Sequence, residues 1–288
     1  MPGAGSQPGT AGARAPLERL SLNQITTRAW SLPEAVDGCT RAGITAIGLW
    51  RDKVAEVGLD AAAALVRDAG LRVSSVCRGG FFVVTDPDER ARRRADNRLA
   101  VDETAALGAD TLVLVCGGQG EHPLASARDM VGDGIADLAP YAASRGVRLA
   151  IEPLHPMYCA DRSVIVTLGQ ALDVAEAFPP EQVGVVVDTF HVWWDPQVTT
   201  QIARAAGRIA SFQVCDWLVP LPDVLLGRGL MGDGLIEFPD LLDAVDAAGY
   251  DGPIEVEIFN RAIWDTPGDE VVAAVKERFA THVVGRRG

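Results

Sequence analysis

Short β-rich runs of residues alternate with longer amphipathic stretches about eight times along this chain. Two of the runs, 112–115 and 183–187, are apolar throughout, as strands buried on both faces are. Strands that alternate with helices form a parallel sheet. Eight such units in about 270 residues fit a closed barrel better than an open sheet, and no GxGxxG turn follows the first run. The sequence therefore predicts an α/β fold, a single (β/α)8 TIM barrel.

The positions of the runs predict where the elements lie. The expected strands are Leu20–Thr27, Thr45–Trp50, Arg72–Arg78, Thr111–Cys116, Arg148–Leu154, Gly184–Thr189, Ile209–Asp216 and Pro253–Phe259. The expected helices include Pro33–Ala42, Asp88–Leu107, Ala127–Ser144, Leu168–Phe178, Gln197–Ala206 and Pro239–Ala248.

Composition restricts the cellular context and the partners. Residues 1–16 are rich in Gly, Ala and Pro without periodicity, so we expect a disordered tail there and one catalytic barrel domain over residues 17–288. The chain has no run of apolar residues suited to a signal peptide or a membrane span, and its five cysteines are scattered, which predicts a cytoplasmic protein with reduced thiols. A net charge of −13 disfavours nucleic acid and membranes as partners.

Polar side chains occur where the last four expected strands end, and this end of a TIM barrel carries the active site. A single carboxylate at such a place is more often a helix cap or an ion-pair partner. Three carboxylates buried together without a cation are costly, however, and oxygen ligands suit Mn²⁺ or Mg²⁺ better than zinc. The sequence therefore predicts a site for one divalent cation, Mn²⁺ or Mg²⁺, with the ligands Glu152, Asp188, Gln213 and Glu257.

Two histidines lie close to these ligands. His155 follows Glu152 in the segment LAIEPLHP, and His191 lies three residues past Asp188. Either ring could contact a substrate or simply pack against its neighbours. We leave both explanations open for the two histidines.

Other residues near the strand ends are weaker candidates. Trp50 and Arg78 follow the second and third strands and could line a sugar pocket, although an exposed Trp or Arg often has no such role. Asp216 could position a substrate, or it could form part of a turn. Glu255 shares the face of its strand with Glu257 but lies one layer deeper, where we expect it to pair with an arginine inside the barrel.

The residues named so far carry a family resemblance. The Glu152-Pro153 pair, the DxxH of Asp188 and His191, and the ending GDGLIEFPDLLDAVDAAGYDGPIEVEIFN resemble the xylose-isomerase-like TIM-barrel superfamily of sugar isomerases and epimerases. In the ketose 3-epimerases of that family, two glutamates hold the metal and move protons on opposite faces of the substrate. The resemblance assigns these roles to Glu152 and Glu257, metal binding to Asp188, and contact with a substrate oxygen to His191.

Three positions depart from the epimerase pattern or extend it. Gln213 stands where the epimerases have histidine, and in this it is similar to hydroxypyruvate isomerases and 3-dehydroshikimate dehydratases. Val219 stands where their substrate-binding arginine is expected, six residues past that ligand. The run IEPLHPMY resembles subunits that cleave 3-oxo-glycosides or C-glycosides by β-elimination, which would make His155 a catalytic base.

The expected function is a sugar isomerase or epimerase that abstracts a proton next to a carbonyl through a metal-stabilised enediolate. The alternative is a lyase or dehydratase that performs β-elimination on a 3-oxo-sugar or 3-oxo-glycoside. A Schiff-base aldolase is disfavoured because neither Lys53 nor Lys276 lies in an expected strand, while a non-catalytic barrel stays open. The expected partners are an unphosphorylated sugar or keto-sugar and a second copy of the chain or, for the lyase, a small partner subunit.

Overall fold

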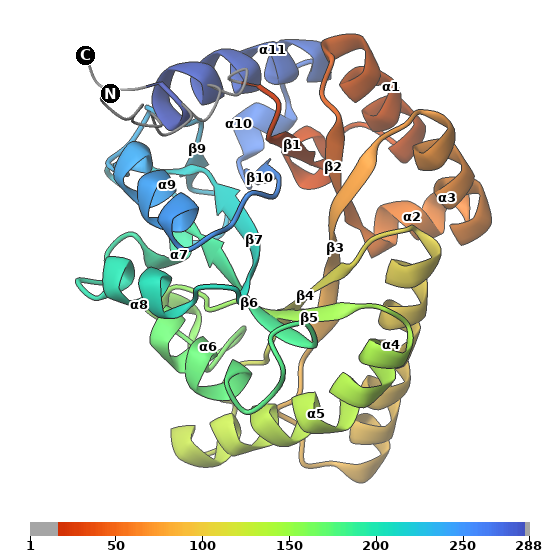
Figure 1. Ribbon diagram of the computed structural model, residues 1–288, viewed down its shortest axis with the longest axis vertical. Helices are drawn as coiled ribbons and strands as arrows, with labels where there is room; N and C mark the ends of the chain where they lie inside the picture. The colour runs from red at the N-terminus through yellow and green to blue at the C-terminus, as the bar shows by residue number, and fades with distance from the viewer. Residues whose placement is uncertain (1–16, 286–288) are drawn as a thin grey trace, which may run out of the picture.

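Eight parallel strands form a closed barrel with helices around its outside (Figure 1). The computed structural model describes residues 17–285, so the expected disordered tail, residues 1–16, lies outside the described residues. The strands pair in the order β1-β10-β7-β6-β5-β4-β3-β2, and β1 also pairs with β2. This arrangement confirms the predicted (β/α)8 barrel. The barrel strands are β1 Leu20–Asn23, β2 Ala46–Trp50, β3 Arg72–Gly80, β4 Thr111–Val115, β5 Arg148–Ile151, β6 Val183–Asp188, β7 Ile209–Val214 and β10 Ile254–Val256.

The helices follow the strands as the alternation predicts. The six expected helices are present with ends shifted by a few residues, whereas α2, α3, α7, α10 and α11 were not among them. The helices are α1 Leu32–Ala42, α2 Arg51–Val57, α3 Leu59–Asp68, α4 Pro87–Ala106, α5 Leu124–Ser144, α6 Leu168–Ala175, α7 Thr189–Val192, α8 Val198–Arg204, α9 Phe238–Ala247, α10 Arg261–Trp264 and α11 Gly268–Arg278. Short helical turns are η1 Gln24–Thr27, η2 Pro156–Tyr158 and η3 Phe279–Val283.

The first strand is shorter than its β-rich run predicts. It ends at Asn23, whose side-chain oxygen accepts a hydrogen bond of 3.0 Å from the backbone N–H of Ile25. This bond caps the 3-10 turn η1, which occupies Gln24–Thr27. The turn directs Asn23 toward the centre of the barrel, where its amide contacts Glu255 and Glu257.

The inside of the barrel has an apolar part and a polar part. Four small or branched residues from β3 to β6 form an apolar cluster separate from the main core: Cys77, Val113, Ala150 and Val186. The facing strands β1, β7 and β10 carry the buried polar side chains of Asn23, Gln213 and Glu255.

A small hairpin interrupts the regular alternation after β7. Its two strands, β8 Asp216–Trp217 and β9 Arg228–Gly229, pair in antiparallel register. The hairpin brings Arg228 back to the carboxyl ends of the barrel strands, where its backbone N–H donates to the carbonyl of Phe259. Within residues 17–285, no helix has the length and apolar character needed to cross a membrane.

Candidate active site

The four predicted metal ligands lie at the carboxyl ends of neighbouring strands. Glu152 follows β5, Asp188 ends β6, Gln213 lies beside Asp188 in the register of β6 and β7, and Glu257 follows β10. All four are buried, with at most 6% of any residue exposed. The structure therefore brings together the carboxylates and the amide that the sequence singled out.

Two oxygen-bearing groups of this set have no hydrogen-bond donor among the described residues. The Oε1 atom of Gln213 is buried and unpaired, while its Nε2 atom faces Oε1 of Glu255 at 3.4 Å. The Glu152 side chain accepts no hydrogen bond from residues 17–285. A buried oxygen without a donor is costly, and a bound cation would remove that cost. The set therefore fits a divalent cation.

Electrostatics support the same conclusion. Burial, together with the charges of Glu257 and Asp188, raises the pKa of Glu152 well above its usual range. Burial also raises the pKa of Asp188 to about 7 and the pKa of Glu257, in both cases against the opposing effect of Arg228. Several carboxylates compete for one arginine, so the site favours the addition of positive charge or protons.

Arg228 is a site residue that the sequence analysis missed. Its Nη1 atom lies 3.2 Å from Oδ2 of Asp188 and 2.8 Å from Oε2 of Glu257. The guanidinium stacks between the rings of Phe190 and Phe259, with centroid distances of 4.8 and 4.7 Å. Arg228 thus neutralises part of the charge of the predicted ligand set and fixes two of its members.

The expected position of a substrate-binding arginine explains this omission. A count of six residues past Gln213 leads to Val219, which is 64% exposed. The β8–β9 hairpin instead supplies Arg228 from further along the chain. Its place directly before the GLMGDG segment was the available sequence signal.

His191 is suited to donate a hydrogen bond and not to bind the metal. One nitrogen of His191 lies within 4.8 Å of oxygens of Glu152 and Asp188, a spacing compatible with a shared ion. However, Nδ1 of His191 accepts a hydrogen bond of 3.0 Å from the backbone N–H of His155. In a neutral imidazole the proton then resides on Nε2, which cannot bind a cation while protonated. Burial and Arg228 lower the pKa of His191 well below its usual range, which keeps the ring neutral.

The side chain of His155 lies outside the small cavity that Glu152 and Glu257 line. Its Nδ1 atom accepts a hydrogen bond of 3.2 Å from Met157, and its ring packs against Trp194 and Trp217. It is not among the residues that line the cavity at Glu152 and Glu257. The arrangement places His155 as a support for His191 through its backbone, and we replace the expected catalytic role with this one.

The other candidate substrate contacts divide into two groups. Trp50 and Arg78 line a cavity of about 120 Å³ together with Glu152, His191 and Glu257. Trp50 also donates from its indole nitrogen to Asn23 at 2.8 Å.

Asp216, by contrast, is fully occupied by backbone. Its carboxylate accepts hydrogen bonds of 2.8–3.0 Å from the N–H groups of Trp217, Gly232, Gly234 and Ile236. Asp216 therefore holds the GLMGDG turn, and the structure does not support its assignment to the substrate.

Among residues 17–285, no arginine pairs with Glu255, contrary to expectation. Its carboxylate accepts hydrogen bonds from Asn23 at 2.5 Å, from Ser74 at 2.5 Å and from Ser75 at 2.9 Å. Gly48 allows this carboxylate to lie against β2, because a Cβ atom at that position would clash with it. These bonds form a polar floor beneath Gln213 and Glu257.

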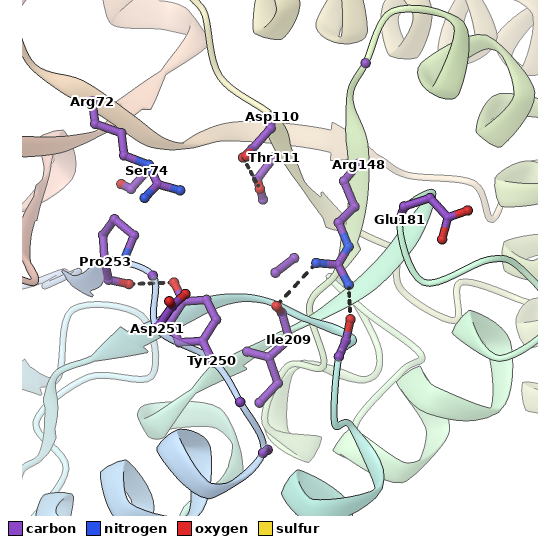
Figure 2. Close-up of a pocket in the computed structure, with 16 residues that line it drawn as sticks. Arg72, Ser74, Asp110, Thr111, Arg148, Glu181, Ile209, Tyr250, Asp251 and Pro253 are labelled. Atoms are coloured by element: carbon purple, nitrogen blue, oxygen red, sulfur yellow. Dashed lines mark hydrogen bonds between the residues drawn. The ribbon is translucent and has the colours of Figure 1, made fainter. Parts of the chain in front are cut away.

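A larger cavity, of about 420 Å³, lies at the opposite end of the barrel (Figure 2). Arg72, Asp110 and Arg148 line it at the amino ends of their strands. Arg148 donates to the carbonyl of Gly207 at 3.0 Å and to that of Ile209 at 3.4 Å, which ties β5 to the start of β7. This end of a TIM barrel contributes stability. We therefore assign the chemistry to the smaller cavity.

Comparison with known proteins agrees with the fold. Residues 36–280 match the family model described as xylose isomerase-like TIM barrel. A crystal structure of a protein from Sinorhizobium meliloti 1021 is 50% identical, with a TM-score of 0.90 over 93% of this chain and 99% of that chain. The L-ribulose 3-epimerase of Mesorhizobium japonicum is 27% identical over 73% of this chain and 70% of its own length.

A more distant structure shares only the fold. The IolI protein, crystallised with a bound zinc atom, is 19% identical and has a TM-score of 0.80, with 92% of this chain and 98% of that chain covered. The matched family model spans most of the barrel, including all four predicted ligands. The chain therefore belongs to the xylose isomerase-like TIM barrel family.

Proposed function

We propose that this protein is a divalent-metal-dependent isomerase or epimerase that removes a proton next to the carbonyl of a small sugar-like compound. The observation that carries the proposal is the placement of Glu152 and Glu257. They line one cavity from β5 and β10, two strands that are separated in the barrel by β6 and β7. Carboxylates placed in this way can take a proton from one position of a substrate and return it at another.

The cation would be held by the four predicted ligands, and oxygen ligands favour Mn²⁺ or Mg²⁺. When bound, it supplies positive charge that stabilises the negative charge developing on the substrate oxygens. The buried, unpaired Oε1 atom of Gln213 supports this assignment.

The protein side chains then have separate tasks. Glu152 accepts the proton, because its carboxylate lines the cavity in which the substrate would lie. Glu257 returns a proton, and its bonds to Arg228 and Asn23 hold it in one orientation. His191 donates from Nε2 to a substrate oxygen. Trp50 closes one side of the cavity.

The β-elimination alternative would need a base near the strand that ends at Glu152. His155 is poorly suited to this role, since Nδ1 accepts a backbone hydrogen bond and the proton therefore resides on Nε2.

Incubation with Mn²⁺ in D₂O tests the proposal. Ketoses, hydroxypyruvate and 3-oxo-glycosides are supplied in turn, and deuterium incorporation next to the carbonyl is measured by NMR. We expect exchange and isomerisation of at least one substrate, and loss of both on treatment with EDTA. Release of an aglycone or of water instead of isomerisation would identify a lyase.

Matched variants test the two glutamates. E152Q and E257Q should each lower turnover by about 100-fold or more, as removal of a general acid or base does. E277Q changes an exposed residue of α11 and should be fully active. Undiminished exchange in both E152Q and E257Q would reject the proposed roles.

A further inference from the structure

Two arginines of the candidate cavity are not paired with a strong counterion. Arg78 lies in β3, near the carboxyl end of the strand, and is half-buried. Its guanidinium lies over the ring of Phe81, 4.6 Å from the ring centroid. It forms no ion pair within residues 17–285. Negative charges on Glu152 and Asp52 favour its protonated form only from a distance.

Arg162 reaches the same cavity from the loop between η2 and α6. Its Nε atom lies 3.8 Å from Asp161, the preceding residue, whose side chain is 67% exposed. An exposed pair at this distance contributes little to the position of either group. The guanidinium lies 5.7 Å from the ring of Tyr158.

Both guanidiniums line the cavity that also contains Glu152, His191 and Glu257. Burial, and to a lesser extent the charge of Arg162, lower the pKa of Arg78. Other half-buried arginines of the described chain have polar partners: Arg51 pairs with Asp96 and Glu103, and Arg148 donates to backbone carbonyls. An acidic protein of net charge −13 has ample carboxylates to pair these two cations as well.

We propose that Arg78 and Arg162 bind a carboxylate of the substrate, so that the enzyme acts on a small keto acid and not on an uncharged sugar. This proposal rests on the proposed function, because it names the substrate class of the same site. Guanidinium groups bind carboxylates through paired, charge-assisted hydrogen bonds. The substrate would lie with its carboxylate at the arginines and its carbonyl toward Glu152 and Glu257. A cavity of about 120 Å³ suits a compound of few carbon atoms.

Matched substrates provide the test. Hydroxypyruvate is compared with dihydroxyacetone, and D-fructuronate with D-fructose, by deuterium exchange in the presence of Mn²⁺. We expect kcat/KM for the acid of at least one pair to exceed that of its neutral partner by about 10- to 100-fold, the usual effect of hydrogen bonds to a charged group. Equal values within both pairs would overturn the proposal. Faster exchange of dihydroxyacetone phosphate than of hydroxypyruvate would overturn the carboxylate assignment in favour of a phosphate.

Variants locate the anion site. R78Q and R162Q should each reduce the acid-to-neutral preference about tenfold or more, mainly through KM. R67Q, which changes an arginine 70% exposed on α3, is the control and should retain the preference. Circular dichroism verifies folding, and R162Q tests the proposal even where R78Q fails to fold. An unchanged preference in R162Q and in folded R78Q would contradict the assignment.

A binding measurement separates the two proposals. Glycerate and glycerol are titrated calorimetrically into EDTA-treated protein, where no turnover is needed. Glycerate that binds more tightly than glycerol, and loses this advantage in R162Q, supports the anion site even if no substrate exchanges deuterium, a result that would reject only the proposed function. Glycerate that binds no better than glycerol overturns the anion site.

Discussion

The backbone N–H of His155 donates a hydrogen bond of 3.0 Å to Nδ1 of His191. This bond determines which nitrogen of the buried imidazole carries the proton. The Nε2–H group lies 3.5 Å from Oδ2 of Asp188 and 3.1 Å from a nitrogen of Arg228. In the contact between His191 and Arg228, two N–H donors face each other. A substrate oxygen that accepts a hydrogen bond from both would remove this repulsion.

Replacement of His191 therefore separates substrate binding from metal binding. H191L should lower kcat/KM by about 10- to 100-fold, because one hydrogen bond to a charged or charge-developing oxygen is lost. H191Q keeps a donor and should lose less. The affinity for Mn²⁺, measured by calorimetry, should stay within about twofold in both variants, since Nε2 carries a proton and cannot bind the ion. A large loss of Mn²⁺ affinity would identify His191 as a ligand.

The unpaired oxygen of Gln213 leads to the opposite pattern. Q213L removes this oxygen and should weaken Mn²⁺ binding about tenfold or more, because a direct ligand matters at least as much as the groups that orient ligands. Q213H supplies a nitrogen ligand and should recover part of the affinity. The same Mn²⁺ affinity in Q213L and the wild type would show that Gln213 is not a ligand.

Glu255 should matter for stability more than for turnover. In E255Q an amide N–H group would face the donors of Asn23, Ser74 and Ser75. We expect the free energy of unfolding to fall by about 1–3 kcal/mol, the usual cost of a buried group left without its partner. Urea denaturation measures this change, with E277Q as the exposed control. A stability equal to that of the wild type would mean that the polar floor tolerates an additional donor.

The pH dependence of stability follows from the raised pKa of Asp188. Its carboxyl has a pKa of about 7 in the folded protein, mainly because of burial, and about 3.9 when unfolded. The folded state thus binds this proton more tightly than the unfolded state does. Protonation of Asp188 therefore stabilises the fold fully below about pH 4, and this stabilisation is lost as the pH rises toward about 7. In EDTA, the wild type should lose stability across this range more steeply than D188N. D68N, which changes an exposed side chain of α3, should keep the wild-type slope.

The barrel and its predicted ligands could be derived from the sequence because both depend on local patterns. Apolar runs such as 183–187 form strands that are buried on both faces, and the polar residue after each run lies at the carboxyl end of its strand. Arg228 could not be derived in this way. It reaches the site through two strands of two residues each, and such a hairpin has no periodicity to detect. The partners of Glu255 escaped prediction for a related reason, since periodicity predicts a face of a strand but not the neighbour across the barrel.

The anchoring of the β8–β9 hairpin has a consequence for protein engineering. Asp216 fixes the base of the hairpin through backbone N–H groups, and Arg228 is fixed by its own carboxylate partners. The intervening residues 218–227 include the exposed Val219 and Val224 and contribute Leu225 to the cavity. A designer can therefore graft segments between these two anchors to alter substrate scope, provided that they keep the contact of the Val224 carbonyl with the Tyr158 hydroxyl, which packs against His191.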